Sequence, residues 1–197
     1  MIDDLLLEKI IDYLNIEFNN DKKRLKHIFS VEKMSIKLAE IYQLSKNRVR
    51  ASALLHDSTK NLTYEENLSL ALKNFNKNEI DNLPRACLHA FSASSLAIER
   101  FNITDKDILN AIAYHCCGRK KMSKLEQVIF ISDYIEETRK FADDELRKLA
   151  KLNLDKATYE ILLKTIKYLK LKNRKIANSS IEALNFYKLK MEDINES

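Results

Sequence analysis

The chain has 197 residues, of which 45% are hydrophobic and 32% are charged, and its formal net charge is +5. These values predict a soluble globular domain with a sizeable core and exclude a disordered protein. No apolar run approaches the roughly 20 residues that cross a bilayer, so we expect no membrane partner. Basic residues alternate with acidic ones instead of clustering with aromatics, which argues against nucleic-acid binding. The acidic amino terminus lacks a signal-peptide pattern, and we therefore expect a cytoplasmic protein.

Glycine and proline are nearly absent, and this scarcity predicts an all-α fold. The one proline, Pro84, suits the first turn of a helix, and the one glycine, Gly118, suits a helix end. Apolar residues at helical spacing predict, in chain order, helices over residues 3–17, 22–43, 46–59, 63–75, 84–101, 104–115, 123–139, 143–151, 154–171 and 179–191. We expect residues 1–197 to form a single domain, with a core over about residues 20–140 and C-terminal helices over about residues 143–191 packing on it.

Three helix starts carry capping signals. Thr63 with Glu66, and Ser123 with Glu126, have the spacing of capping boxes, in which each residue bonds to the backbone of the other. Thr104 is expected to cap the helix that runs to residue 115. These signals agree with the helices that the apolar spacing predicts.

The three cysteines, Cys87, Cys116 and Cys117, do not form a disulfide framework. Cys116 and Cys117 are adjacent, so they lack the CxxC spacing of a zinc or redox site. We interpret all three as small buried thiols.

Six polar residues fall on inward-facing positions of five predicted helices: His27, His56, Asp57, His89, His115 and Asp133. His27, for example, shares a helical line with Val31 and Leu38, and Asp133 lies one turn after Ile129. A polar group on a buried face costs several kcal/mol unless it is satisfied. A single inward histidine is usually a hydrogen-bonded core residue, but six such groups must satisfy one another or share a cation.

The composition of this set predicts a transition-metal site between helices. Nitrogen and oxygen ligands without thiolates suit iron, manganese, cobalt, nickel or zinc better than calcium or magnesium. Adjacent residues on a helix point about 100° apart. This angle allows the neighbours His56 and Asp57 to play different parts in such a site.

The order His…His-Asp…His…His…Asp resembles that of the HD-domain phosphohydrolases. At a finer level the chain is similar to the bacterial YqeK family of symmetrical diadenosine tetraphosphate hydrolases, over about residues 20–185. The matching signatures are Arg24-x-x-His27, His56-Asp57-x-x-Lys60, Tyr114-His115-x-x-Gly118-Arg119 and Asp133-Tyr134-Ile135-Glu136-x-x-Arg139. The chain departs from the family pattern at Ala90, Cys116-Cys117, Glu137 and Ala177-Asn178, none of which is a predicted ligand. At Cys116-Cys117 the family commonly has small residues or threonine.

The resemblance implies an HD-domain helical bundle and a hydrolase that cleaves diadenosine tetraphosphate into two ADP. It implies one or two metal ions, with iron expected and manganese, cobalt, nickel or zinc as alternatives. The first ion would be held by His27, His56, Asp57 and Asp133. His89 and His115 would hold a second ion that Asp57 bridges, or would contact phosphate if only one ion is bound.

Basic residues beside these ligands are expected to bind the phosphates, because arginine forks bind phosphate oxygens in pairs and lysine acts as a point charge. Lys60 and Arg139 are the strongest candidates, followed by Arg119 and then Arg24. The predicted catalytic residues are Asp57, Lys60 and Arg139. The predicted substrate-binding residues are Arg24, Asp57, Lys60, His89, His115, Arg119, Asp133 and Arg139.

Two other functions stay open at this point. The chain could be another HD phosphohydrolase, acting on a nucleotide monophosphate, a deoxynucleoside triphosphate or a guanosine alarmone. It could instead be a nucleotide-binding or interaction protein whose metal is structural. In each enzyme hypothesis the partner is a small nucleotide, and the sequence leaves a homodimer open.

Overall fold

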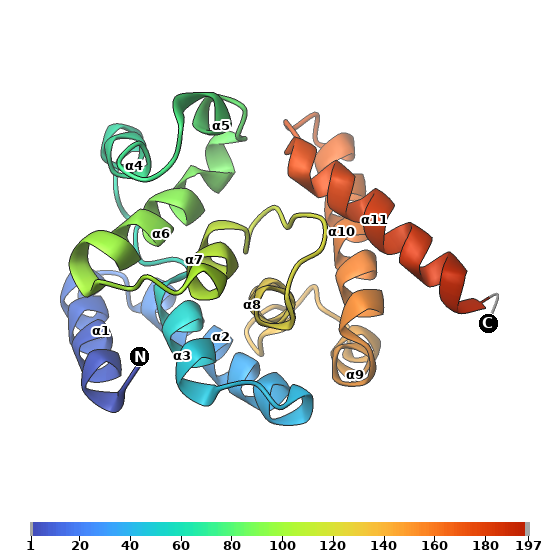
Figure 1. The fold of residues 1–197 in the computed structure, drawn as a ribbon, viewed down its shortest axis with the longest axis horizontal. Coiled ribbons are helices and arrows are strands. Elements are labelled where there is room, and N and C mark those ends of the chain that lie inside the picture. The colour runs from blue at the N-terminus through green and yellow to red at the C-terminus, as the bar shows by residue number, and fades with distance from the viewer. Residues whose placement is uncertain (1, 196–197) are drawn as a thin grey trace.

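The computed structural model describes residues 2–195, which contain helices and no β-strand (Figure 1). The all-α prediction is therefore confirmed. In chain order the helices are α1 (Asp4–Glu17), α2 (Lys22–Tyr42), α3 (Lys46–Leu55), α4 (Tyr64–Ala71), α5 (Lys77–Asp81), the 3-10 helix η1 (Arg85–Cys87), α6 (Leu88–Phe101), α7 (Lys106–Ala113), α8 (Lys124–Ile135), α9 (Asp144–Leu152), α10 (Leu154–Leu171) and α11 (Asn178–Asn195). None of these helices combines the length and the apolar character that a membrane crossing requires.

Helix α8 is the centre of the packing. It contacts α2, α3, α7, α9 and α10, and Figure 1 views it nearly end-on with these helices around it. Every residue from Leu125 to Ser132 is buried, including Glu126 and Gln127. A helix that is buried on all sides must be apolar around most of its circumference, as this segment is. A polar side chain on α8 therefore needs a partner inside the protein.

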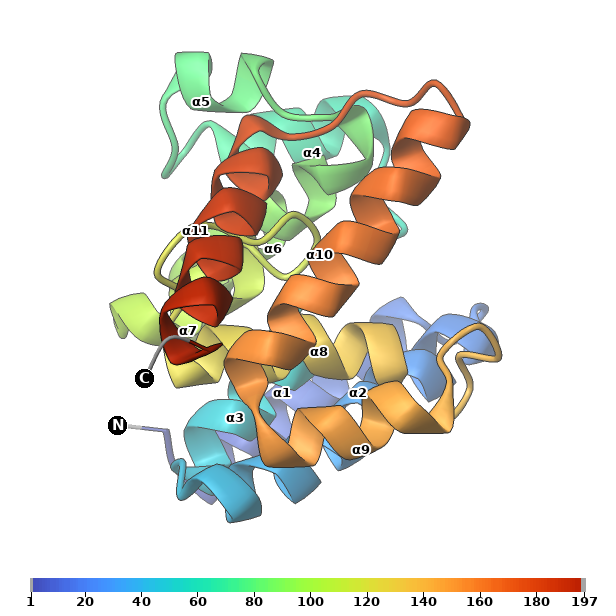
Figure 2. The same cartoon turned by 90° about the vertical axis from the view of Figure 1, so that its right-hand side faces the viewer.

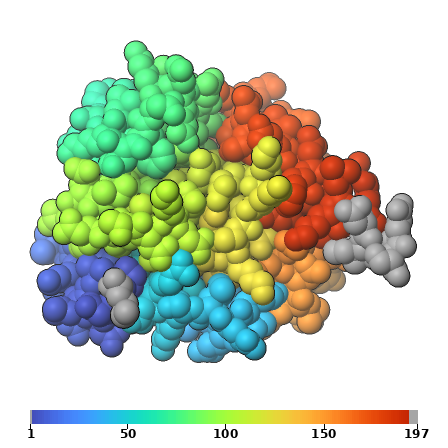
Figure 3. Space-filling view, in the orientation of Figure 1, coloured from blue at the N-terminus to red at the C-terminus, as the bar shows by residue number. Residues whose placement is uncertain are grey.

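The C-terminal helices pack on this centre. Helices α10 and α11 lie side by side (Figure 2), and α10 also packs on α8 and α9. In the space-filling view, consecutive segments form contiguous blocks of colour (Figure 3). Helices that are neighbours in sequence are thus mostly neighbours in space, which short connections favour.

Both predicted capping boxes are confirmed, at Thr63 and at Ser123. The predicted cap at Thr104 was wrong, because the cap of α7 is Asp105. Its carboxylate accepts hydrogen bonds from the backbone N–H groups of Asp107 and Ile108 and is also bound by Arg48 at 2.8 and 2.9 Å. A carboxylate that satisfies two free N–H groups and pairs with an arginine outcompetes the neighbouring hydroxyl.

The boundaries between residues 63 and 101 also differ from the prediction. Helix α4 ends at Ala71, and a short helix that the sequence did not indicate, α5, follows after Asn76, whose side chain caps it. Pro84 does not lie in the first turn of an α-helix. It precedes the 3-10 helix η1, and the α-helix α6 begins only at Leu88.

Three further helices end earlier than predicted, each within two residues of a predicted ligand. The helix predicted over residues 46–59 ends at Leu55, the one over 104–115 at Ala113 and the one over 123–139 at Ile135. At two of these ends a histidine ring forms a hydrogen bond with a backbone carbonyl. Nδ1 of His56 lies 2.6 Å from Ala53 O, and Nδ1 of His115 lies 2.7 Å from Ile112 O. The last carbonyls of a helix lack partners in the helix itself, and these rings satisfy them.

Candidate metal and active site

The structure brings the six predicted ligands together in one cluster. All four histidines and Asp57 are buried, and the Asp133 side chain is 21% exposed. His27 lies on α2, His89 on α6 and Asp133 on α8, as predicted. The other three were predicted on helices but lie just beyond them: His56 is the C-terminal cap of α3, and Asp57 and His115 lie in turns.

Asp57 lies at the middle of the cluster. Its Oδ2 is 3.7 Å from Nε2 of both His27 and His56, while its Oδ1 is 3.0 Å from Nε2 of His89 and 3.7 Å from Nε2 of His115. The two carboxylate oxygens therefore face different histidine pairs. This is the arrangement of a group that can bridge two metal positions.

We call the side with His27, His56 and Asp133 the carboxylate half. Nε2 of His27 lies 3.4 Å from Nε2 of His56 and 3.1 Å from Oδ1 of Asp133. On the other face of the His27 ring, Nδ1 lies 3.1 Å from Oε1 of Glu136, whose side chain is fully buried. A carboxylate that accepts this N–H fixes the tautomer and points the Nε2 lone pair into the cluster.

The sequence prediction gave Glu136 no role. The sequence did contain a signal for such a role, because Glu136 follows Asp133 by three residues at the end of a strongly apolar helix. The Thr138 backbone N–H donates to Oε2 of Glu136 at 2.6 Å, and the Thr138 hydroxyl donates to Oε1. These bonds hold the carboxylate against His27.

We call the opposite side, with His89, His115 and Cys116, the thiol half. Nε2 of His89 lies 3.4 Å from Nε2 of His115. The Cys116 Sγ lies 3.3 Å from His89 Nε2 and 3.2 Å from His115 Nε2. Cys87 and Cys117 are buried as predicted, whereas Cys116 is partly exposed and lies among the candidate ligands. The interpretation of Cys116 as a buried thiol of the core is therefore corrected.

Three of the four predicted basic residues lie at the cluster. Lys60 Nζ is 3.0 Å from His89 Nε2 and 3.7 Å from Asp57 Oδ1. Arg24 pairs with Oδ2 of Asp57, and Arg139 donates to Oδ1 of Asp133 at 2.8 Å. These three side chains are 27–33% exposed, so each can reach a ligand from the surface.

Arg119 is held elsewhere. Its guanidinium makes two bonds, of 2.7 and 2.6 Å, to Glu126 and lies over the ring of Tyr114. Glu126 is also the acidic member of the capping box with Ser123. The structure pairs Arg119 with this buried carboxylate and not with the six cluster residues.

Burial and charge together set the protonation of His56, Asp57 and Asp133. Burial lowers the pKa of His56 to about 4, so its imidazole is neutral at pH 7. Burial alone would raise the pKa values of Asp57 and Asp133, but the neighbouring histidines, together with Lys60 at Asp57 and Arg139 at Asp133, lower both below the usual range. Neutral imidazole and ionised carboxylate are the forms that bind metal.

The donor atoms suit a divalent transition metal. Ligand atoms of His27, His56 and Asp57 lie within 4.8 Å of one another, and so do those of His89, His115 and Cys116. Imidazole and carboxylate donors, most of them buried, fit such an ion better than Ca²⁺ or Mg²⁺.

Three pockets open at the cluster. The first, of about 510 Å³, is lined by His115 and Asp133 and by aromatic side chains of α8, α10 and the loop between α8 and α9. The second, of about 400 Å³, is lined by His27, Arg24 and Arg139, and the third, of about 340 Å³, by His89 and Lys60. All three are therefore lined by a histidine and at least one basic side chain, which in the first pocket is Lys164.

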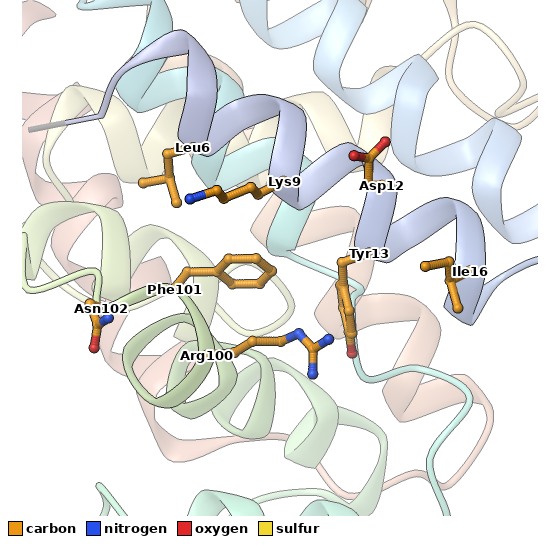
Figure 4. A pocket seen from close by; sticks show the side chains of 8 residues that line it. All are labelled: Leu6, Lys9, Asp12, Tyr13, Ile16, Arg100, Phe101 and Asn102. Carbon is orange, nitrogen blue, oxygen red and sulfur yellow. The ribbon is translucent and has the colours of Figure 1, made fainter.

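A further pocket, of about 540 Å³, lies between α1 and the end of α6 (Figure 4). It contains none of the predicted site residues. The Arg100 guanidinium lies 4.5 Å from the ring centre of Tyr13, which also contacts Phe101 edge to face. We interpret these contacts as packing between the two helices.

The chain is similar to several known proteins. The HD-domain family model matches residues 24–138. A symmetrical bis(5'-nucleosyl)-tetraphosphatase from Staphylococcus aureus is 33% identical, over 89% of this chain and 92% of that protein. The protein of the same name from Bacillus subtilis is 34% identical, over 76% of this chain and 81% of its own length.

A crystal structure from Clostridium acetobutylicum, described as a predicted HD superfamily hydrolase involved in NAD metabolism, is also similar. It superposes with a TM-score of 0.84 at 35% identity and covers 93% of this chain and 97% of its own. The chain therefore belongs to the HD-domain family and, within it, to the group of the symmetrical bis(5'-nucleosyl)-tetraphosphatases.

Proposed function

We propose that the protein is a metal-dependent hydrolase that cleaves diadenosine tetraphosphate symmetrically into two ADP. The observation that carries this proposal is the position of Asp57, between two histidine pairs and beside the charges of Arg24 and Lys60. The names of the Staphylococcus and Bacillus relatives, which match over most of their length, support the choice of substrate.

We propose iron as the metal. The carboxylate half and Asp57 would hold one ion through His27, His56 and Asp133, and Asp57 with His89 and His115 would hold a second. When bound, such a metal acts as a Lewis acid and makes a water nucleophile available near neutral pH. Imidazole and carboxylate donors suit iron, with manganese, cobalt, nickel and zinc as competitors that the test below compares.

The basic residues would act on the phosphates. Attack of water on an inner phosphorus breaks the bridge at the centre of the tetraphosphate chain, and one ADP leaves as the other forms. Negative charge on the phosphate oxygens is met by Lys60 on the thiol half and by Arg24 and Arg139 on the carboxylate half. Charges held in position before the reaction stabilise the transition state without reorganising.

The aromatic pocket would hold an adenine. Phe141 and Tyr168 line it and are 61% and 51% exposed, and Phe141 packs edge to face on Tyr134. Large aromatic side chains exposed beside a charged site are suited to stacking on a base. Because this pocket joins α8 to α10, we also propose that the C-terminal helices belong to the same functional domain as the metal site.

The test is chromatography of the products from diadenosine tetraphosphate, with Fe²⁺, Mn²⁺, Co²⁺, Ni²⁺ or Zn²⁺ added to metal-free protein. Two ADP as the product, with Fe²⁺ the most effective ion, is the expected result. AMP plus ATP would reject symmetrical cleavage. Turnover only of a nucleotide monophosphate, a deoxynucleoside triphosphate or a guanosine alarmone would select another HD phosphohydrolase. Binding without turnover of any of them would select the non-catalytic alternative.

A further inference from the structure

Cys116 sits where a metal ligand would sit in the thiol half. Its Sγ lies 3.3 Å from His89 Nε2 and 3.2 Å from His115 Nε2. Oδ1 of Asp57 faces the same two histidines, at 3.0 and 3.7 Å. The two nitrogens and the sulfur lie within 4.8 Å of one another, and the Asp57 oxygen faces the same two nitrogens. Two nitrogens, one oxygen and one sulfur match the number and kind of donors that a four-coordinate ion takes.

The backbone holds the sulfur in this place. His115 and Cys116 lie in the turn that follows α7, and the ring of His115 is anchored to Ile112 O at 2.7 Å. Gly118 ends the turn with φ +65, where it lies against side chains of α8 and α10. The carbonyl of Cys117 accepts a 2.6 Å hydrogen bond from the buried Ser180 hydroxyl, which ties the turn to α11.

The neighbouring cysteine provides an internal comparison. Cys117 is 3% exposed and packs in the small hydrophobic cluster with Cys87, Phe91 and Ala177. Cys116 packs against the edge of the same cluster, but its Sγ also contacts Nε2 of both His89 and His115. The backbone of this turn places Cys116 beside the histidines, and the mere presence of several cysteines in the chain does not explain its position.

We propose that Cys116 is a ligand of the ion in the thiol half, together with His89, His115 and Asp57. Its thiol loses a proton to solvent when the ion binds, and the sulfur then donates to the metal. A thiolate makes this half softer than the carboxylate half, so that it favours Zn²⁺ and Co²⁺ over Mn²⁺. The assignment rests on the proposed metal-dependent function and adds a ligand to it.

The test uses metal-free full-length protein titrated with Co²⁺ under reducing, anaerobic conditions. Visible absorption reports bound Co²⁺, and a thiolate-to-cobalt charge-transfer band in the near-ultraviolet reports sulfur coordination. We expect this band in the wild type and in Cys117→Ala, and its loss in Cys116→Ala. Direct titration of Cys116→Ala should also show Zn²⁺ affinity in the thiol half reduced by more than the roughly 10- to 100-fold that loss of an outer partner of a ligand costs, with Mn²⁺ affinity changed less.

Two bound Co²⁺ ions per chain without the charge-transfer band in the wild type would overturn the assignment, and so would a band that persists in Cys116→Ala. This first outcome needs no variant, so it stands even if Cys116→Ala fails to fold. Cys116→Ser, which keeps the size of the side chain, provides a second variant. Wild-type protein that binds no Co²⁺ at all would overturn the metal-dependent function as well, whereas loss of the band alone leaves that function intact.

Discussion

The two halves of the site are built differently around the shared Asp57. In the carboxylate half, His27 is oriented by the buried Glu136, and Asp133 is paired with Arg139. In the thiol half no carboxylate lies behind the rings among the described contacts: His115 bonds a backbone carbonyl, and His89 has the Lys60 ammonium within 3.0 Å of Nε2.

This difference indicates that the two halves have different roles in binding metal and substrate. A histidine with a carboxylate behind it is a stronger metal ligand, and its ring orientation is set before the metal arrives. The ammonium of Lys60 instead lies against Nε2 of His89, the atom that would bind a metal. Lys60 must therefore move away when His89 binds an ion. We therefore expect the carboxylate half to bind metal first, and the thiol half to combine metal binding with contact to phosphate. Four substitutions test this comparison.

The largest effect is expected from Asp57→Ala, because it removes the group that both halves share. Activity should fall by at least about 10³-fold, beyond the 10- to 100-fold that loss of an outer partner of a ligand costs. Metal content should fall at both positions, measured by elemental analysis after gel filtration. Asp12→Ala, at an exposed aspartate of α1, is the control. An Asp57→Ala protein that keeps both ions would contradict the proposal that Asp57 is shared by two metal positions.

Lys60→Ala should lower kcat on the order of 10²-fold, because it removes a positive charge from the place where phosphate charge develops. It keeps all six predicted ligands, so metal content should stay at the wild-type level. Steady-state kinetics with diadenosine tetraphosphate separates the alternatives. A higher KM with unchanged kcat would mean that Lys60 only binds substrate. Unchanged constants would mean that it is a surface cation, and Arg139→Ala would then test the carboxylate half.

Glu136→Gln should weaken metal binding about 10- to 100-fold in the carboxylate half alone, because a neutral amide no longer polarises His27. Titration of metal-free protein, followed by calorimetry, should show the tighter class of sites weakened and the other unchanged. Glu137→Gln is a matched control, since Glu137 is exposed and pairs with Lys33 and Lys37 at the surface. Equal weakening of both classes would contradict the division between the halves.

Arg119→Ala should have the smallest effect on turnover, because Arg119 pairs with Glu126 outside both halves. Leaving that buried carboxylate without its partner should cost about 1–3 kcal/mol of unfolding free energy. Denaturant unfolding should detect this loss, while kcat stays at the wild-type value. Lys120→Ala, at the exposed neighbour, should change neither. A large fall in kcat with unchanged stability would instead indicate that Arg119 acts on the substrate.

Local pattern in the sequence was enough to determine the all-α fold and the set of six polar residues that meet in the cluster. Helical spacing reports which side chains face inward, and an inward histidine or aspartate must find a partner because its burial is costly. The same spacing did not locate the ends of α3, α7 and α8. Helices α3 and α7 stop where His56 and His115 turn toward the site and satisfy carbonyls themselves, and α8 stops before the buried Glu136.

Only the tertiary structure decided which partners these residues find. His27 and Glu136 are separated by 109 positions, and Cys116 and His89 by 27, so no local pattern links them. Arg119 is a second example: its position beside the His115 turn predicts phosphate binding, and only the structure shows that it bonds Glu126 of α8. Periodicity along one helix specifies the face a residue occupies, whereas the atom it meets depends on how distant helices pack.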